Sequence, residues 1–303
     1  MSAALNVSAS VMARLLTRAK SSGEDYQLLV TAYAFERRLY RLGQSPLRDR
    51  FVLKGAMLLR LWSDQPYRAT RDLDLLRRGD ASLSAIRSDL QVVLATPVAD
   101  DGITFDAAGL MLEPIRTDDE YVGTRVTLPA RCGKARLSLQ VDLGVGDAVW
   151  PEPEVQRYPT LLDAPAPEVF AYQRETVVAE KLEALVVLGD RNSRIKDFFD
   201  LHMLATTFAF DRRDLGESVR RTFTQRQTPI PDEAPIGLTP TYWENPSRPT
   251  QVRAFARRAG LAATAETGRA FHTVLSAFLL PVLDDVAAGA PRAGTWAPGG
   301  PWT

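Results

Sequence analysis

Two carboxylates lie two residues apart in the segment Arg68-Ala-Thr-Arg-Asp-Leu-Asp-Leu-Leu76, and they are the first candidates for chemistry. Successive side chains of a strand point to opposite faces, so Asp72 and Asp74 share one face of the predicted strand. Their Cα atoms would lie about 7 Å apart, and both carboxylates can then bind the same one or two divalent ions. The pair predicts a metal site, although two exposed acids on an edge strand would show the same pattern.

Two further segments carry residues that suit this chemistry. Residues 135–143 alternate apolar and polar side chains, which predicts a strand whose polar face carries Asp142. An apolar run leads into Lys54 and Gly55 further upstream. This order of a glycine turn, an acidic strand and a later acidic strand resembles the nucleotidyltransferase superfold of the DNA polymerase β-like group. The resemblance implies that the turn approaches an NTP and that the three carboxylates bind Mg²⁺ (or Mn²⁺).

The chemistry explains the residue types. A triphosphate carries about four negative charges, and two metal ions neutralise them while orienting the attacked phosphate. Carboxylates on rigid strands supply the oxygen ligands that magnesium prefers. The superfold usually has Gly-Gly or Gly-Ser at the turn, whereas Gly55 precedes Ala56, so a hydroxyl donor to phosphate is missing. Lys54 can replace that contact, and the alternative is a solvated lysine of a helix.

Lysine is rare in this chain, and one lysine lies on the apolar side of the helix predicted at 168–189. Lys181 falls inside an apolar stripe that includes Leu185 and Leu188. A buried ammonium costs several kcal/mol unless an anion contacts it. We therefore expect Lys181 to contact nucleotide phosphates, or Asp200 across a cleft between two domains. Its replacement by Met would then keep or raise the melting temperature. The alternative is a lysine whose stem covers apolar surface while its ammonium reaches water.

The segment from Ser193 to His202 predicts a helix that Ser193 caps. Asp197 and Asp200 lie three residues apart on its polar face. We favour Asp200 as the functional acid, because an acid in the first turn, such as Asp197, already stabilises the helix dipole. His202 lies on the apolar side and is expected to pack in the core.

With these residues in place, the chain resembles the AbiEii/AbiGii toxin family of nucleotidyltransferases, which includes the MenT toxins. The resemblance covers about residues 25 to 205 and rests on five motifs in order. These are Glu36-Arg-Arg-Leu-Tyr-Arg-Leu42, Phe51-Val-Leu-Lys-Gly55, Arg68-Ala-Thr-Arg-Asp-Leu-Asp74, Glu175-Thr-Val-Val-Ala-Glu-Lys-Leu182 and Arg194-Ile-Lys-Asp-Phe-Phe-Asp-Leu201.

That resemblance implies roles for particular residues. It makes Asp72 and Asp74 the metal pair, and it completes the active site with Lys181 and an acid of the last motif, for which we take Asp200. Thr70 stands where some family members carry a phosphorylatable serine of the active site. Together these assignments predict a nucleotide-binding set, namely Lys54, Gly55, Thr70, Arg71 and Lys181.

The resemblance also implies partners. Known family members are the toxin halves of toxin–antitoxin pairs, and several transfer a nucleotide from an NTP to the 3′ end of tRNA, which blocks aminoacylation. An NTP substrate, a tRNA acceptor and a cognate antitoxin are therefore expected. Residues 212–258 support an RNA acceptor, because they hold nine arginines against five acids, with Tyr242 and Trp243 as candidate stacking groups. An ordinary solvated helical surface would explain the same composition.

Two other functions remain open at this point. The chain can be a nucleotidyltransferase that modifies a small molecule or a protein hydroxyl, which would keep every catalytic residue. It can also be an NTP-binding module without turnover that acts through a partner. The Gly55-Ala56 departure gives that alternative some weight, whereas the presence of Asp72, Asp74, Asp142 and Lys181 argues against it. Labelled NTPs, magnesium and total RNA would distinguish the three.

Composition is typical of a globular protein of 303 residues, with 45% hydrophobic residues and a net charge of zero. A single cysteine, Cys132, excludes an intramolecular disulfide and a cysteine-based zinc cluster. The sequence shows neither a signal-peptide pattern nor eighteen uninterrupted apolar residues. We therefore expect a cytoplasmic protein without membrane association.

The pattern of elements predicts an α+β fold. A nucleotidyltransferase domain, a mixed sheet with flanking helices, is expected over 1–160. A helical domain over 161–290 is expected to complete the active site and bind the acceptor, and a disordered tail over 291–303 follows. Strands are predicted at 121–128 and 135–143, and the prolines of 151–167 suggest a linker. Helices are predicted at 8–20, 24–42 with Gly43 as terminator, 81–95, 168–189, 193–208, 211–226, 250–259 and 264–288, and the apolar run 51–62 is read with the helical part.

Overall fold

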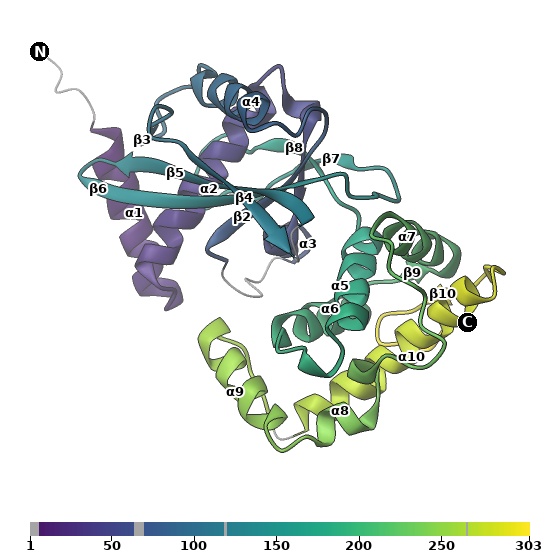
Figure 1. Ribbon diagram of the computed structural model, residues 1–303. Coiled ribbons are helices and arrows are strands. Elements are labelled where there is room, and N and C mark those ends of the chain that lie inside the picture. The colour runs from purple at the N-terminus through teal and green to yellow at the C-terminus, as the bar shows by residue number, and fades with distance from the viewer. Residues whose placement is uncertain (1–5, 64–69, 118–119, 265) are drawn as a thin grey trace, which may run out of the picture. The chain divides into compact units, whose positions relative to one another are not determined.

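The computed structural model describes residues 6–63, 70–117, 120–264 and 266–303. The chain is an α+β protein, as predicted, and it folds as two compact units (Figure 1). Unit 1 consists of Met1–Gly146 and Glu154–Ala171, and unit 2 of Asp147–Pro153 and Tyr172–Thr303.

The domain boundary predicted at residue 160 lies inside unit 1. The proline-rich segment contains strand β7 (Glu154–Arg157), which pairs with β8 (Glu168–Ala171). Strand β8 in turn pairs in parallel with β1 (Phe51–Lys54), so both strands belong to the sheet of unit 1. Pro159, Pro165 and Pro167 therefore lie in the loop between two paired strands of unit 1, whereas Pro151 and Pro153 lie in the segment Asp147–Pro153 of unit 2.

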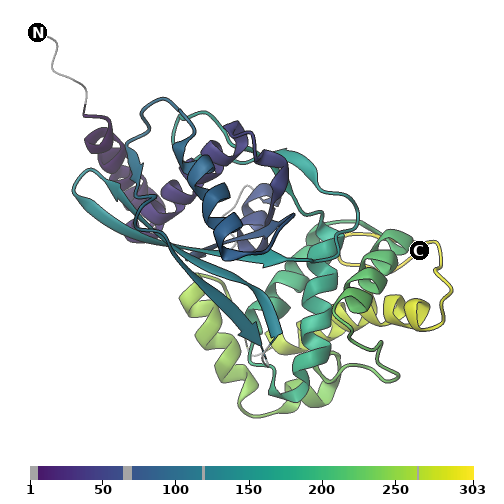
Figure 2. The ribbon, with the colours of Figure 1, turned by 45° about the horizontal axis from the view of Figure 1, so that its top comes forward.

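Unit 1 is built on a mixed sheet of eight strands in the order β3-β5-β6-β2-β1-β8-β7, with β4 paired to β5. The remaining strands are β2 (Asp72–Arg77), β3 (Ile103–Phe105), β4 (Met111–Thr117), β5 (Glu120–Cys132) and β6 (Ala135–Val145). Strands β2 and β6 run parallel, whereas β1 and β2 are antiparallel. The long β5–β6 hairpin is prominent in Figures 1 and 2.

Strand β1 was not expected from the sequence, which reads 51–62 as part of a helical region. Its Phe51-Val-Leu run is buried at every position, because β1 lies between β2 and β8 inside the sheet. Interior strands covered on both faces lack alternation, so periodicity alone cannot distinguish them from buried helices. The chain then turns at Gly55 and forms a short helix, α3 (Leu59–Trp62).

Three longer helices belong to unit 1, namely α1 (Val7–Ser22), α2 (Tyr26–Gln44) and α4 (Leu83–Ala95). Helix α2 packs against α1, α4 and strands β6 and β8. Gly43 was expected to end α2 but lies within it. A Cβ atom there would lie 2.6 Å from the backbone oxygen of Glu168, so glycine allows α2 to approach β8 closely.

Unit 2 is helical, as predicted. Its helices are α5 (Arg174–Leu188), α6 (Ile195–Thr207), α7 (Arg212–Gln225), α8 (Pro240–Glu244), α9 (Arg248–Ala259) and α10 (Thr267–Ala287). Most bounds predicted for these helices lie within a few residues of the observed bounds. The exception is the helix expected over 168–189, whose first residues form β8.

The C-terminal residues were expected to be disordered, and this prediction is wrong. Strand β10 (Thr295–Trp296) pairs with β9 (Phe210–Asp211). The Trp296 side chain is buried, and its Nε1 donates a hydrogen bond to the Ala205 oxygen at 2.7 Å. Proline and glycine content suggested disorder, but burial of this tryptophan against α6 and α10 orders the segment.

Helix α10 is the one helix among the described residues that is long and apolar enough to cross a membrane. Its Leu275, Phe278, Leu279 and Val282 are buried within unit 2, where α10 packs against α6 and α7. That burial is typical of the core helix of a globular unit.

Candidate active site

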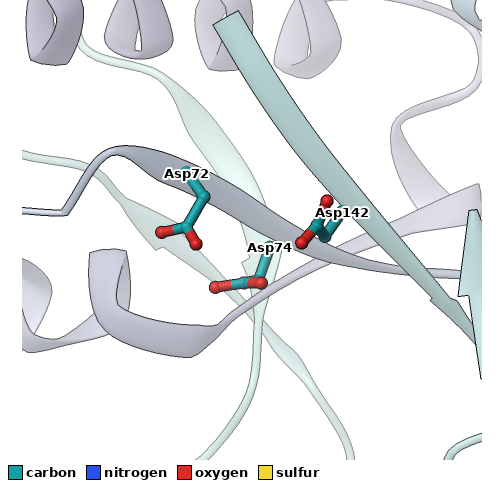
Figure 3. A group of neighbouring side chains, drawn as sticks. All are labelled: Asp72, Asp74 and Asp142. Carbon is teal, nitrogen blue, oxygen red and sulfur yellow. The ribbon is translucent and has the colours of Figure 1, made fainter. Parts of the chain in front are cut away.

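The parallel pairing of β2 with β6 brings three carboxylates together. Asp74 lies directly opposite Asp142 in the register, and Asp72 lies two residues before Asp74 on the same face. One oxygen from each carboxylate lies within 4.8 Å of the others. Figure 3 shows the carboxylates of the two strands turned toward one another. The structure thus assembles the three acids that the sequence singled out.

The alternation of each strand explains why these acids share one face. Leu73 and Leu75 of β2 and Val141 and Leu143 of β6 are buried, whereas the acids between them are partly exposed. The apolar side chains anchor both strands in the core of unit 1, so the carboxylates project from a rigid support.

Gly55 brings the backbone up to this cluster. It follows β1 with a φ of +71°, a conformation that residues with side chains rarely adopt. A Cβ atom at this position would lie 2.1 Å from Oδ2 of Asp74. Glycine is required here for two reasons, because the φ is positive and because the turn directly adjoins the carboxylate.

Four charged residues form a row across four neighbouring strands. Lys54 of β1 lies opposite Asp74, Asp74 opposite Asp142, and Asp142 opposite Arg125 of β5. Directly opposed residues project from the same face of a sheet. The two carboxylates therefore lie between two cationic residues, and the carboxylate of Asp72 adjoins this row.

Arg125 was not predicted from the sequence. Its Nε and Nη2 donate hydrogen bonds to the two oxygens of Asp142 at 3.0 and 2.8 Å. These hydrogen bonds raise the pKa of Arg125 above its ordinary value, against a smaller opposing effect of burial. The only sequence signal was its place on the polar side of the strand predicted at 121–128, and the register that places it opposite Asp142 is not readable locally.

The residues before β2 also adjoin the cluster. The Thr70 hydroxyl donates hydrogen bonds to the Asp72 carboxylate and, at 3.3 Å, to the Asp72 backbone oxygen. Arg71 is exposed beside them. Arg68 and Ala69, the first two residues of the motif, lie outside the described residues. Thr70 therefore adjoins one carboxylate of the cluster, and its place beside a triphosphate stays a prediction.

The donor set fits a hard divalent cation. Three carboxylate oxygens from two strands converge, and Mg²⁺ or Mn²⁺ binds such oxygens while keeping several waters. Lys54 and Arg125 at the ends of the row limit the repulsion among the acids. Asp72, Asp74 and Asp142 are thus able to hold a metal ion.

A second group of charges lies within unit 2. Nζ of Lys181 on α5 lies 2.7 Å from Asp197 Oδ1 and 2.8 Å from Asp200 Oδ2, both on α6. The Asp197 and Asp200 side chains are 2% and 1% exposed, and that of Lys181 is 17% exposed. Burial tends to lower the pKa of Lys181, but the two carboxylates outweigh it and hold that pKa above its ordinary value.

This geometry bears on three expectations. Lys181 has the anionic contacts that its apolar position requires, but Asp200 belongs to the same unit and the contact does not cross between units. Asp197 is about as close to the ammonium as Asp200, so the distances do not favour Asp200 over Asp197 as the acid that pairs with Lys181. Ser193 does not cap α6: Arg194 is the N-cap residue, and no side chain there accepts a hydrogen bond from the first turn.

The family follows from the sequence as a whole. A family model described as nucleotidyl transferase AbiEii toxin, type IV toxin–antitoxin system, matches residues 37–277. The chain belongs to the AbiEii family. This confirms the predicted membership and makes the protein a toxin-family nucleotidyltransferase, a class whose members use an NTP and have an antitoxin counterpart.

Solved structures show the same fold. JHP933 from Helicobacter pylori shares 15% identity, with 88% of this chain and 95% of that chain covered and a TM-score of 0.50. MenT4, a nucleotidyltransferase toxin from Mycobacterium tuberculosis, shares 17% identity, with 93% and 99% covered and a TM-score of 0.50. The AbiEii protein thus resembles both over nearly its whole length. Among curated proteins, none matches it.

Most of the arginines proposed to bind RNA have partners within unit 2 of the AbiEii protein. Arg220 and Arg221 contact Glu217 at 2.8 and 2.6 Å, and these contacts lower the pKa of Glu217 to about 2. Arg226 contacts Glu183, a buried acid of α5. Two further arginines are likewise engaged, Arg212 with Asp285 and Arg248 with the backbone oxygens of Asp190 and Asn192.

The two proposed stacking residues both make contacts within unit 2. Tyr242 is 3% exposed, and its hydroxyl donates to the Asn192 oxygen at 2.7 Å. The Trp243 ring packs edge-on against Phe198 at 4.7 Å, and its Nε1 donates to the Gly237 oxygen. The prediction is therefore wrong for Tyr242, whose ring is buried, whereas Trp243 is partly exposed and its role as a stacking group stays a prediction.

His202 packs as predicted. Its ring lies 5.1 Å from that of Phe271, and burial lowers the pKa of His202. A neutral imidazole against an aromatic ring is a packing arrangement, which agrees with the role expected from its apolar position.

Proposed function

We propose that this AbiEii protein is a metal-dependent nucleotidyltransferase that transfers a nucleotide from an NTP to the 3′ end of tRNA. We propose further that it is the toxin half of a toxin–antitoxin pair and acts in the cytoplasm. One observation carries the catalytic part of this proposal. Asp72, Asp74 and Asp142 converge within 4.8 Å on the strands that follow a glycine turn.

The carboxylates would hold Mg²⁺ or Mn²⁺. When bound, the metal supplies charge neutralisation and orientation of the attacked phosphate. Asp72 and Asp74 bind it from one strand, and Asp142 binds from the next with its carboxylate held by Arg125. Asp142 is also suited to orient the acceptor hydroxyl, because it lies on a different strand from Asp72 and Asp74.

The turn after β1 would receive the triphosphate. Gly55 leaves the space beside Asp74 free of a side chain, so backbone N–H groups can reach a phosphate. Lys54, opposite Asp74, supplies a positive charge that offsets the missing hydroxyl of the Gly55-Ala56 turn. Thr70 and Arg71 adjoin Asp72 and complete the proposed nucleotide-binding set with Lys181.

Lys181 has a partly exposed side chain, and two buried carboxylates hold its ammonium in place. We propose that it contacts a nucleotide phosphate from this fixed position, with Asp200 and Asp197 as its supports. A lysine held in this way donates to phosphate without the entropic cost of ordering a flexible side chain.

The proposed acceptor surface is narrower than the sequence suggested. Helix α9 holds four arginines and no acidic residue, and Arg253, Arg257 and Arg258 are exposed. Exposed arginines without neighbouring acids on their own helix suit the phosphates of RNA, because each contact releases counterions. We therefore assign the RNA contact to this face of α9, and not to Arg220 and Arg221, which Glu217 engages.

Incubation with each of the four α-labelled NTPs, magnesium and total RNA tests this function. The proposal predicts label at the 3′ ends of tRNA. Label on a protein or a small molecule would show a nucleotidyltransferase with another acceptor. Binding of NTP without any label transfer would show a binding module. After induction in bacteria, sequencing of tRNA 3′ ends provides a second readout. Intact ends in growth-arrested cells would contradict the tRNA assignment.

A further inference from the structure

Arg125 holds the one carboxylate of the cluster that lies on a separate strand. Its Nε donates to Oδ1 of Asp142 at 3.0 Å and its Nη2 to Oδ2 at 2.8 Å. Nε2 of Gln140 donates to Oδ2 as well, at 3.2 Å. All three residues belong to β5 and β6 of unit 1. The Asp142 carboxylate is therefore fixed in both position and plane.

These contacts select the oxygen that remains for a metal ion. A carboxylate offers about four lone-pair sites, two on each oxygen. Oδ2 of Asp142 accepts two of the three hydrogen bonds and Oδ1 accepts one. The free lone pair is therefore on Oδ1, which makes Asp142 a ligand through a single oxygen, whereas without Arg125 both oxygens would be available.

The charge of Arg125 acts on the same site. The guanidinium lies in the row of charged residues beside Asp142, and Asp72 is close enough to add to the attraction it feels. The Arg125 guanidinium repels a metal ion that binds to the carboxylates. This repulsion decreases only with the inverse of distance, and the site is partly shielded from water. Arg125 thus offsets one negative charge that would otherwise attract the metal.

We propose that Arg125 is a positioning residue of the carboxylate cluster, which keeps Asp142 as a single-oxygen ligand and lowers the affinity of the cluster for divalent metal. This inference rests on the proposed function, since it takes the three carboxylates to be the metal site. Asp142 held in this way keeps its second oxygen off the metal, so the geometry needed to orient the acceptor hydroxyl is present before substrate binds.

A purely structural ion pair would behave differently. Arg125 and Asp142 have side chains that are 46% and 18% exposed, and exposed pairs add little to stability. Loss of Arg125 should therefore leave the fold nearly unchanged and still alter metal binding. Arg131 provides a matched control, because it is an exposed arginine of the same strand that lies opposite Arg136, outside the charged row.

The test is a Mn²⁺ titration of the full-length, metal-free protein, followed by calorimetry or by the spin resonance of free Mn²⁺. We expect Arg125→Gln to bind Mn²⁺ about tenfold more tightly than the wild type, because one opposing charge is removed. Arg125→Lys keeps the charge and should bind within about twofold of the wild type, as should Arg131→Gln. Thermal melting of each variant checks that the fold is retained.

Turnover supplies the second readout. Arg125→Gln and Arg125→Lys should both lower kcat for nucleotide transfer on the order of tenfold with KM for NTP unchanged, since neither holds Asp142 by two parallel hydrogen bonds. Arg131→Gln should keep the wild-type kcat. Unchanged or weaker Mn²⁺ binding by Arg125→Gln, or a wild-type kcat for Arg125→Lys, would overturn the inference while leaving the metal site intact. Wild-type Mn²⁺ binding no stronger than that of Asp74→Asn would overturn the metal site itself, and this inference with it.

Discussion

Replacement of Gly55 by alanine tests how the turn after β1 serves the carboxylates. The added methyl group would lie 2.1 Å from Oδ2 of Asp74, well inside van der Waals contact. The carboxylate must then retreat by about 1 Å or more. A misplacement of that size near the reacting atoms can lower the rate about 10²-fold. We therefore expect Gly55→Ala to reduce nucleotide transfer by about two orders of magnitude and to weaken Mn²⁺ binding.

The same substitution also strains the backbone, and Gly23 separates the two effects. Gly23 has a φ of +74°, close to the +71° of Gly55, and no described heavy atom lies within 4 Å of a Cβ placed there. Each alanine costs about 1–2 kcal/mol for the left-handed conformation. Each should therefore lower the melting temperature by about 2–8 °C.

Transfer of label from an α-labelled NTP and Mn²⁺ titration are the assays, with melting curves of both variants beside them. Similar losses of stability, with transfer lost only in Gly55→Ala, are expected. The reasoning would be refuted by a Gly55→Ala protein that melts like Gly23→Ala and transfers nucleotide at the wild-type rate, because Asp74 would then tolerate the displacement that the geometry requires.

Three further predictions concern unit 2. Lys181→Met should lower the free energy of unfolding by about 3–5 kcal/mol in denaturant titrations, because it leaves two buried carboxylates without their ammonium; an unchanged or raised value would contradict this, and the exposed Lys196→Met is the control. Glu217→Gln should lower the melting temperature at pH 7, and its difference in melting temperature from the wild type should vanish as the pH falls from 4.5 to about 2. The pKa of Glu217 is lowered in the folded state, so its stabilisation is lost when it is protonated. A difference that persists at pH 2 would contradict the ion-pair origin. Combined Arg257→Glu and Arg258→Glu should weaken RNA binding and flatten its salt dependence by about one log–log unit per lost contact; NTP affinity should not change, and unchanged RNA affinity would remove α9 from the acceptor surface.

The prediction for Lys181 reverses the one made from sequence, and the reason is physical. The helical wheel correctly placed the lysine on a buried face and required an anion. It could not show that two acids of the neighbouring helix α6 supply that anion from within the same unit. If Lys181 contacted only a nucleotide, its replacement would not lower the stability of the free protein. Because Lys181 belongs to a buried ion pair, its replacement lowers the free energy of unfolding.

Local alternation was enough to predict the faces of the two strands that carry the three acids. The period of two placed Asp72, Asp74 and Asp142 on polar faces, and the burial of the intervening residues confirms it. The pairing of the two strands came only from the resemblance to a superfold. Arg125 was missed because the register between β5 and β6 depends on contacts that are distant from any one motif.

Aromatic residues near arginines were the least reliable signal. Tyr242 and Trp243 lie in an arginine-rich segment, yet both pack against Phe198 in the core of unit 2. Composition does not distinguish a stacking platform from a buried aromatic cluster, because a helix that buries aromatic rings on one face commonly carries charged side chains on its exposed face. In the C-terminal segment the error had the opposite sign. Its glycines and prolines suggested disorder, whereas burial of Trp296 orders the segment.

The most direct test of the central claim compares nucleotide transfer by the wild type with transfer by Asp74→Asn across a magnesium titration. Glu154→Gln is the matched control, because Glu154 is an exposed acid of the same sheet outside the carboxylate cluster. We predict magnesium-dependent label transfer by the wild type and Glu154→Gln, and none by Asp74→Asn at an unchanged or slightly higher melting temperature, since one of three mutually repelling charges is removed. Near-wild-type transfer by Asp74→Asn would contradict the assignment of these carboxylates as the metal site of a nucleotidyltransferase.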